Sequence, residues 1–237
     1  MVLLHSLLAD KGSFHRILGP LARDFRLIVL DLPGFGESSP VTGGLVEIAD
    51  RVAAAVVELT HGDKPVILGN GFGGFIALQL AIRHPGIASR LVLADCGATF
   101  SGPGKQAFLA MATTAAEKGL GAIVETAMRR LFSAKFQEQN PALMALRRAA
   151  FLRTDVATFQ AACLALASLD LRSEVVRVKT PVLVLVGEDD EATPPPMSVE
   201  LNSLLPDSRL TILPGCAHVP QLQDPDAFLD AIAEFVR

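Results

Sequence analysis

The chain of 237 residues lacks several features that would mark other classes of protein. No apolar run reaches the roughly 18 residues that a membrane-spanning helix needs, so we expect no membrane partner. Basic residues do not predominate, because the formal net charge is -4, and this disfavours nucleic acid as a partner. Internal repeats and low-complexity linkers are also absent. With 50% hydrophobic and 19% charged residues, the composition predicts one large globular domain, or one domain with an inserted lid.

Cysteine is scarce, and the three cysteines are far apart, odd in number and without metal-ligand spacing: Cys96, Cys163 and Cys216. We interpret them as small buried apolar side chains in a reducing compartment, which predicts a cytoplasmic location. The apolar start of the chain has no positively charged n-region, so we interpret it as a strand rather than a signal peptide. No metal and no organic cofactor is implied.

Short apolar strands alternate with helical patterns over much of the chain. Strands are predicted at residues 2–4, 26–30, 65–68, 90–94, 182–186 and 210–213. Helices are predicted at residues 14–22, 45–59, 72–83, 197–205 and 227–236. Near-continuous apolar strands are typical of a parallel sheet that is covered on both faces. The pattern therefore predicts an α/β fold with a mainly parallel sheet and helices on both sides.

The alternation stops between residues 101 and 172, where the pattern is helical throughout. A helical insertion between strands of one sheet predicts a lid over the carboxyl edge, where open α/β sheets bind ligands. We therefore expect a core of residues 1–100 and 173–237 and a lid of residues 101–172. The lid contains nine Lys or Arg against five acids, which favours a carboxylate-bearing substrate. The alternative is that these charged residues, Arg147 and Arg148 among them, only lie on solvent-exposed helix faces and bind no substrate.

The loop after strand 65–68 carries the sharpest motif, Gly69-Asn70-Gly71-Phe72-Gly73-Gly74. It matches the nucleophile elbow G-x-S-x-G, a tight strand-to-helix turn whose central residue has a strained backbone. Gly71 stands where the serine is expected, and glycine is comfortable in such a turn. Several explanations of this glycine remain open: an inactivating substitution, natural loss in a protein that kept its fold, a sequence error, or a natural enzyme that uses different chemistry.

Three more loops follow predicted strands. Asp190 lies in the loop of residues 187–194, and His218 lies in the loop of residues 215–220. The order nucleophile, acid, histidine is the order found in α/β hydrolases. Residues His5-Ser6-Leu7 follow the first strand, where an oxyanion donor is expected. We interpret Ser6 as a turn residue there, with a substitute catalytic hydroxyl as the alternative.

Together these motifs resemble the α/β-hydrolase superfamily: LHSL (4–7), DLPGFGES (31–38), GNGFGG (69–74), GEDDEATP (187–194) and GCAH (215–218). Within it, the chain resembles 3-oxoadipate enol-lactonases and related hydrolases. The resemblance implies hydrolysis of a carboxylic ester or an enol-lactone, with a small molecule as substrate. It makes Asp190, rather than Asp189, the acid of the G-x-x-D-x-x-x-P pattern, and it makes His218 the base. The backbone N–H groups of Leu7 and Phe72 would form the oxyanion hole.

The sequence departs from the family pattern in two places. Gly71 replaces the serine, which puts acyl-enzyme chemistry in doubt. The chain also begins within the third strand of the usual sheet, so the first β-hairpin is expected to be missing. That would leave strand 26–30 on an unpaired edge. A shortened chain or a misassigned start codon would account for this.

Two other functions remain open at this stage. One is an enzyme without an acyl intermediate, a lyase or a water-based hydrolase, that uses the dyad of His218 and Asp190. The other is a catalytically silent ligand-binding protein. The sequence names neither the substrate nor the oligomeric state.

Overall fold

A computed structural model describes all residues from Met1 to Arg237. Its centre is a six-stranded sheet in the order β2-β1-β3-β4-β5-β6. The strands are β1 (Val2–Leu4), β2 (Ile28–Leu30), β3 (Val66–Asn70), β4 (Arg90–Ala94), β5 (Val182–Gly187) and β6 (Ser208–Leu213). Every neighbouring pair is parallel. The predicted parallel α/β fold is therefore confirmed.

Burial follows position in the sheet. All residues of β3 and β5 are buried, as their near-continuous apolar sequences predict, whereas β2 is only half-buried. The predicted strand at 26–30 begins two residues later, at Ile28. It has β1 as its only neighbour and forms one edge of the sheet, as expected.

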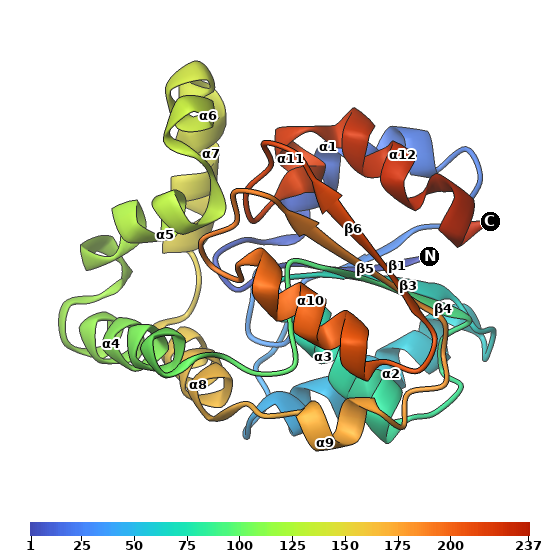
Figure 1. Cartoon of the computed structure of the whole chain (residues 1–237). Coiled ribbons are helices and arrows are strands. Elements are labelled where there is room, and N and C mark those ends of the chain that lie inside the picture. The colour runs from blue at the N-terminus through green and yellow to red at the C-terminus, as the bar shows by residue number, and fades with distance from the viewer.

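Helices cover both faces of the sheet (Figure 1). On one face lie α1 (His15–Leu21), the short α11 (Pro220–Gln223) and α12 (Pro225–Val236), preceded by the 3-10 turn η1 (Lys11–Phe14). On the other lie α2 (Leu45–Thr60), α3 (Phe72–Arg83) and α10 (Pro195–Leu204). Phe14 and Phe228 are fully buried in the first layer, and Phe75 and Ile76 in the second. The predicted helix at 197–205 begins earlier, at Pro195, because proline suits the first helical turn.

The helical segment lies between β4 and β5, at the carboxyl edge of the sheet (Figure 1). Its elements are α4 (Gly102–Lys118), η2 (Leu120–Ala122), α5 (Val124–Leu131), α6 (Ala134–Gln139), α7 (Pro141–Leu152) and α8 (Val156–Ser168). The short α9 (Arg172–Val175) that follows packs against α3 and α10 on one face of the sheet. Apolar residues of α4 and α8, such as Phe108 and Phe159, join the same hydrophobic core as α2 and α3. This packing holds the helices against the sheet edge.

No single helix of this structure combines the length and the apolar composition that crossing a membrane requires. Helices α7 and α8 reach both only when they are taken together, and they are bent by 93° relative to each other.

Candidate active site

Gly71 occupies the sharp turn between β3 and α3. Its φ of 53° and ψ of -116° lie in a region that residues with a side chain rarely adopt. The turn is tight because its glycines allow close backbone contacts: a Cβ on Gly73 would overlap the carbonyl group of Leu4. A Cβ on Gly71 would overlap Ser6 Oγ and lie 2.6 Å from His218 Nε2. The elbow conformation predicted from the sequence is thus present without a side chain at its centre.

Asp190 and His218 meet at the same edge of the sheet, from the loops after β5 and β6. His218 Nδ1 lies 2.9 Å from Asp190 Oδ2, and both side chains are buried. Asp190 Oδ1 accepts hydrogen bonds from the backbone N–H groups of Ala192 and Thr193, at 2.7 and 3.1 Å. The Thr193 hydroxyl donates to Asp190 Oδ2 at 2.6 Å. Neighbouring Asp189 is exposed instead, so Asp190 is the carboxylate that orients the histidine.

The surroundings of Asp190 favour its charged form. Burial alone would raise the pKa of this carboxyl group. The positive charge that His218 carries when it is protonated, together with the hydrogen bonds from His218 and Thr193, outweighs burial, so that the pKa of Asp190 is lowered. An ionised Asp190 accepts the hydrogen of Nδ1, which leaves the lone pair of His218 Nε2 pointing away from the carboxylate.

Ser6 is the neighbour of that nitrogen. Ser6 Oγ lies 3.1 Å from His218 Nε2, and the serine is 1% exposed. Its backbone carbonyl accepts hydrogen bonds from His5 Nδ1 at 2.9 Å and from the N–H of Ala9 at 3.1 Å. The interpretation of Ser6 as a turn residue missed this contact. No local sequence pattern could have revealed it, because it depends on the register in which Leu4 pairs with Gly69, so that Ser6 and Gly71 each follow two residues later.

A second buried network lies behind the dyad and was not identified from the sequence. Asn70 Nδ2 donates to Asp95 Oδ2 at 3.0 Å and to the carbonyl oxygen of His218 at 2.9 Å. Gln221 Nε2 donates to Asn70 Oδ1 at 3.1 Å, and the N–H of Gly187 donates to Asp95 Oδ1 at 2.9 Å. Asp95 directly follows β4, so the reasoning that selected Asp190 could also have selected it.

Asp95 is a carboxyl group that favours its neutral form. Burial, followed by the nearby charge of Asp190, raises its pKa well above the ordinary value. Ligand atoms of Asp95, Asp190 and His218 lie within 4.8 Å of one another, a spacing that could hold a metal ion. The Asp190 and His218 atoms already bond to each other and Asp95 accepts two hydrogen bonds, so we assign the group as a hydrogen-bond network.

The predicted oxyanion donors, Leu7 and Phe72, line the same small pocket as Ser6, Gly71 and His218. The N–H of Leu7 donates to no acceptor within the protein. Phe72 is the first residue of α3, where N–H groups have no partner within the helix. Both groups are thus available for a negatively charged oxygen.

The helical segment closes the pocket with Phe108, Arg130 and Leu166. The remaining internal volume is about 20 Å³, room for about one water molecule. The Arg130 guanidinium lies 5.6 Å from the centre of the Phe108 ring and has no carboxylate partner. Burial lowers the pKa of Arg130.

The two arginines singled out in the sequence lie elsewhere. Arg147 pairs with Asp10 at 2.7 Å, and Arg148 pairs with Glu125 at 2.8 Å. Both charges are therefore already matched, and neither residue lines the pocket. Of the basic residues in the helical segment, Arg130 is the one that faces His218.

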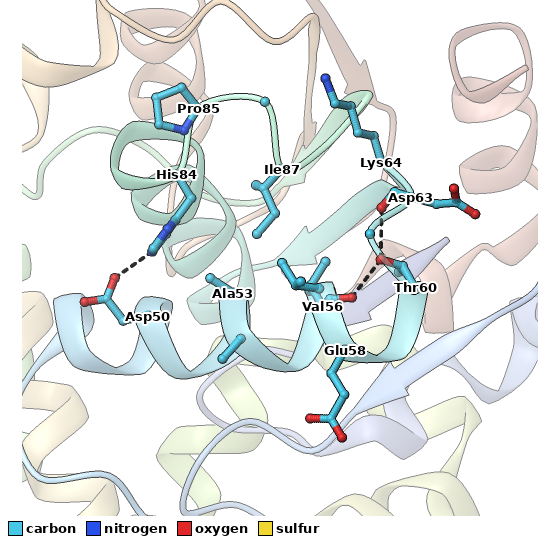
Figure 2. A pocket seen from close by; sticks show the side chains of 14 residues that line it. Asp50, Ala53, Val56, Glu58, Thr60, Asp63, Lys64, His84, Pro85 and Ile87 are labelled. Atoms are coloured by element: carbon cyan, nitrogen blue, oxygen red, sulfur yellow. Dashed lines mark hydrogen bonds and ion pairs between the residues drawn. The ribbon is translucent and has the colours of Figure 1, made fainter.

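A wider groove of about 830 Å³ lies away from this site, between the end of α2 and the loops that precede β3 and β4 (Figure 2). It contains the hydrogen bond between His84 Nε2 and Asp50 Oδ1 at 2.7 Å and the hydrogen bond from Thr60 to the carbonyl of Val56. None of the predicted site residues lines it. We therefore place the chemistry in the small pocket at the opposite, carboxyl edge of the sheet.

Comparison with known proteins gives the same fold. Residues 1–225 match the family model described as alpha/beta hydrolase fold. The chain is 30% identical to the pimeloyl-[acyl-carrier protein] methyl ester esterase of Aeromonas hydrophila, over 100% of this chain and 94% of that protein.

Two solved structures are also similar. A thermophilic esterase from Thermogutta terrifontis, with malate bound, has a TM-score of 0.90 and 28% identity, over 100% of this chain and 88% of the other. The enol-lactonase from Burkholderia xenovorans LB400 has a TM-score of 0.92 and 26% identity, over 99% of this chain and 90% of the other. The chain therefore belongs to the alpha/beta hydrolase fold family.

Proposed function

We propose that this chain hydrolyses a small carboxylic ester or lactone, with His218 as the general base and Asp190 as its orienting acid. The observation that carries the proposal is the buried His218–Asp190 pair, joined at 2.9 Å and facing a pocket beside the elbow. The esterase and enol-lactonase among its relatives support the same reaction class.

The geometry supports a proton transfer through Nε2. Asp190 accepts the hydrogen of Nδ1, so Nε2 can take a proton from an attacking hydroxyl group or water. The N–H groups of Leu7 and Phe72 would hold the oxygen that becomes negative in the tetrahedral intermediate. With glycine at position 71, the attacking group does not come from the elbow. Loss of a triad serine lowers turnover by roughly 10⁶-fold, while the remaining site retains roughly 10³- to 10⁴-fold over water, so we expect slow turnover.

Arg130 supports a substrate that carries a carboxylate. Its guanidinium has no acidic partner, lines the pocket with His218 and lies over the Phe108 ring, and the residue is half-buried. A carboxylate at hydrogen-bond distance would supply the missing charge. The related Thermogutta esterase was determined with malate bound, which supports the same class of ligand.

The first test compares hydrolysis of p-nitrophenyl acetate and mono-p-nitrophenyl succinate by the native protein and by His218→Ala. We expect slow hydrolysis by the native protein and none above background in the variant. Binding of the succinate ester without turnover, and without dependence on His218, would favour the silent binding protein instead.

The second test concerns the carboxylate. Arg130→Gln should raise KM for the succinate ester by about 10- to 100-fold, the value of a charge-assisted hydrogen bond, and leave the acetate ester unchanged. Arg129→Gln is the matched control, because Arg129 precedes Arg130 on α5 but is exposed. Equal effects of the two variants would reject the role of Arg130.

A further inference from the structure

We propose that Ser6 is the nucleophile of this protein, supplied by the loop after β1 in place of the elbow residue. The inference rests on the proposed function, since it names the group that His218 would deprotonate. Four observations carry it: the place of the hydroxyl group, its partner, its fixed backbone and its contrast with the other buried serines.

The Ser6 hydroxyl fills the space that a side chain on residue 71 would enter. Strands β1 and β3 are neighbours, and Leu4 pairs with Gly69. Ser6 and Gly71 each follow this pair by two residues, so they lie side by side. A Cβ built on Gly71 overlaps Ser6 Oγ. The absence of a side chain at the elbow is therefore what leaves room for the serine in the loop after the adjacent strand.

The partner of this hydroxyl group is the catalytic nitrogen. Ser6 Oγ lies 3.1 Å from His218 Nε2, and His218 Nδ1 lies 2.9 Å from Asp190 Oδ2. Since Asp190 accepts from Nδ1, the Ser6 hydroxyl donates to Nε2. Serine, histidine and aspartate thus form one continuous hydrogen-bonded chain, which is the arrangement that activates a serine for attack.

The backbone around Ser6 holds the hydroxyl group in place. The N–H of Leu32 donates to His5 Nε2 at 3.0 Å, so His5 carries its hydrogen on Nδ1 and donates it to the Ser6 carbonyl at 2.9 Å. The N–H of Ala9 donates to the same carbonyl. Leu7 follows Ser6 just as Phe72 follows Gly71, so an oxyanion donor stands directly after each position.

The other two buried serines have no such arrangement. Ser198 Oγ donates to the backbone carbonyl of Cys96, which is an ordinary structural role. Ser13 Oγ has no hydrogen-bond partner and lies outside the pocket. Among the buried serines, Ser6 alone is bonded to a histidine and lines the pocket.

The chemistry balances without any further reactant except water. Ser6 Oγ attacks the carbonyl carbon of the ester while its proton moves to His218 Nε2. The bond from the carbonyl carbon to the leaving oxygen then breaks, and His218 returns the proton to that oxygen, which departs as the alcohol. Water attacks the acyl group on Ser6 with His218 again as base, and the acid leaves as the Ser6 hydroxyl is restored.

The experiment is covalent labelling with an alkyl fluorophosphonate, followed by peptide mass spectrometry and, in parallel, hydrolysis of p-nitrophenyl acetate. Native protein should carry the label on Ser6. Ser6→Ala and His218→Ala should lose it and should lower kcat by at least about 10²-fold. Ser13→Ala is the matched control, because it removes an equally buried hydroxyl group outside the pocket, and it should label and react as the native protein does.

Two outcomes separate this inference from the proposed function. If Ser6→Ala hydrolyses the ester at the native rate while His218→Ala does not, the dyad activates water and only the role of Ser6 is overturned. If native protein neither hydrolyses the ester nor takes the label, both are overturned. Should Ser6→Ala fail to fold, Ser6→Cys keeps the side-chain volume, and its thiol should react with iodoacetamide only when His218 is present. An unreactive thiol in that folded variant also overturns the proposal.

A swap of the two positions gives the sharpest readout. In Gly71→Ser the new side chain meets Ser6 Oγ and His218 Nε2, so this single change should increase hydrolysis little. The double change Ser6→Ala with Gly71→Ser removes that overlap, and the label should move to the peptide that contains position 71. Full activity of the single variant with Ser6 unlabelled in the native protein would contradict the proposal.

Discussion

At position 71, the backbone conformation and the surrounding space both favour glycine over a residue with a side chain. With φ at 53° and a new Cβ overlapping Ser6 Oγ, Gly71→Ala should lower the free energy of unfolding by about 1–3 kcal/mol. Urea denaturation measures the change. Gly19→Ala is the control, because Gly19 lies exposed in α1 with nothing within 4 Å of the added Cβ, and it should raise stability by about 0.5–1 kcal/mol. The same sign for both variants would contradict this account.

Also at the residue scale, Asp95 makes stability depend on pH. Its pKa is raised in the folded protein, so above about pH 4 the unfolded chain releases the proton more readily and folding stability falls as pH rises. The slope contributed by this group is up to about 1.4 kcal/mol per pH unit within that range.

Asp95→Asn removes this ionisation. The decline in the free energy of unfolding from about pH 4 upward should therefore be smaller in the variant than in the native protein. Denaturation at a series of pH values checks this. A parallel pH dependence in both proteins would show that Asp95 is not the group responsible.

At the scale of elements, a partly buried ion pair with Asp10 joins helix α7 to the loop after β1, in addition to the apolar packing of α7. Asp10 follows β1 and accepts from Arg147 of α7 at 2.7 Å, and its side chain also caps η1 through the N–H of Gly12. Asp10→Asn keeps a capping side chain but leaves Arg147 without its counter-ion. We expect a loss of about 1–3 kcal/mol and faster hydrogen exchange in α7.

A second ion pair on α7 supplies the control for the pair of Asp10 and Arg147. Arg148 and Glu125 form an ion pair of similar length whose side chains are 34% and 60% exposed. Arg148→Gln should therefore change stability by no more than about 1 kcal/mol. If the two variants were equally destabilised, burial of the Asp10 pair would not be the cause.

At the scale of the whole molecule, the helical segment and the core enclose a pocket with room for about one water molecule. We propose that residues 101–172 act as a lid, so that it must move before an ester can bind. Leu166 of α8 contributes to the closure and is 2% exposed.

Leu166→Ala should enlarge the pocket and change the preference for acyl length. The ratio of kcat/KM for p-nitrophenyl butyrate to that for the acetate should rise roughly tenfold, since each buried methylene is worth about 0.8 kcal/mol. The protein should also lose about 2–5 kcal/mol of stability. Leu146→Ala, at a position that is 62% exposed on α7, should change neither quantity. An unchanged ratio in Leu166→Ala would place the acyl chain elsewhere.

The sequence by itself determined the architecture and the main chemistry-bearing loops. Continuous apolar strands and helical periodicity are local patterns, so they predict a parallel α/β sheet without any knowledge of contacts. Parallel strands end at one edge, which is why Asp190 and His218 could be expected to meet there. The prediction that the three cysteines are buried was also confirmed, because free cysteine is among the most buried residue types. The cytoplasmic location inferred from them stays a prediction.

Only the tertiary structure decided which side chains touch. The contact of Ser6 with His218 joins residues 212 positions apart. The network of Asn70, Asp95 and Gln221 joins the end of β3, the loop after β4 and helix α11. Arg130 faces the pocket while adjacent Arg129 does not, because packing of α5 selects one side of the helix. Such contacts depend on strand register and on the angle at which helices pack, and no local pattern encodes either.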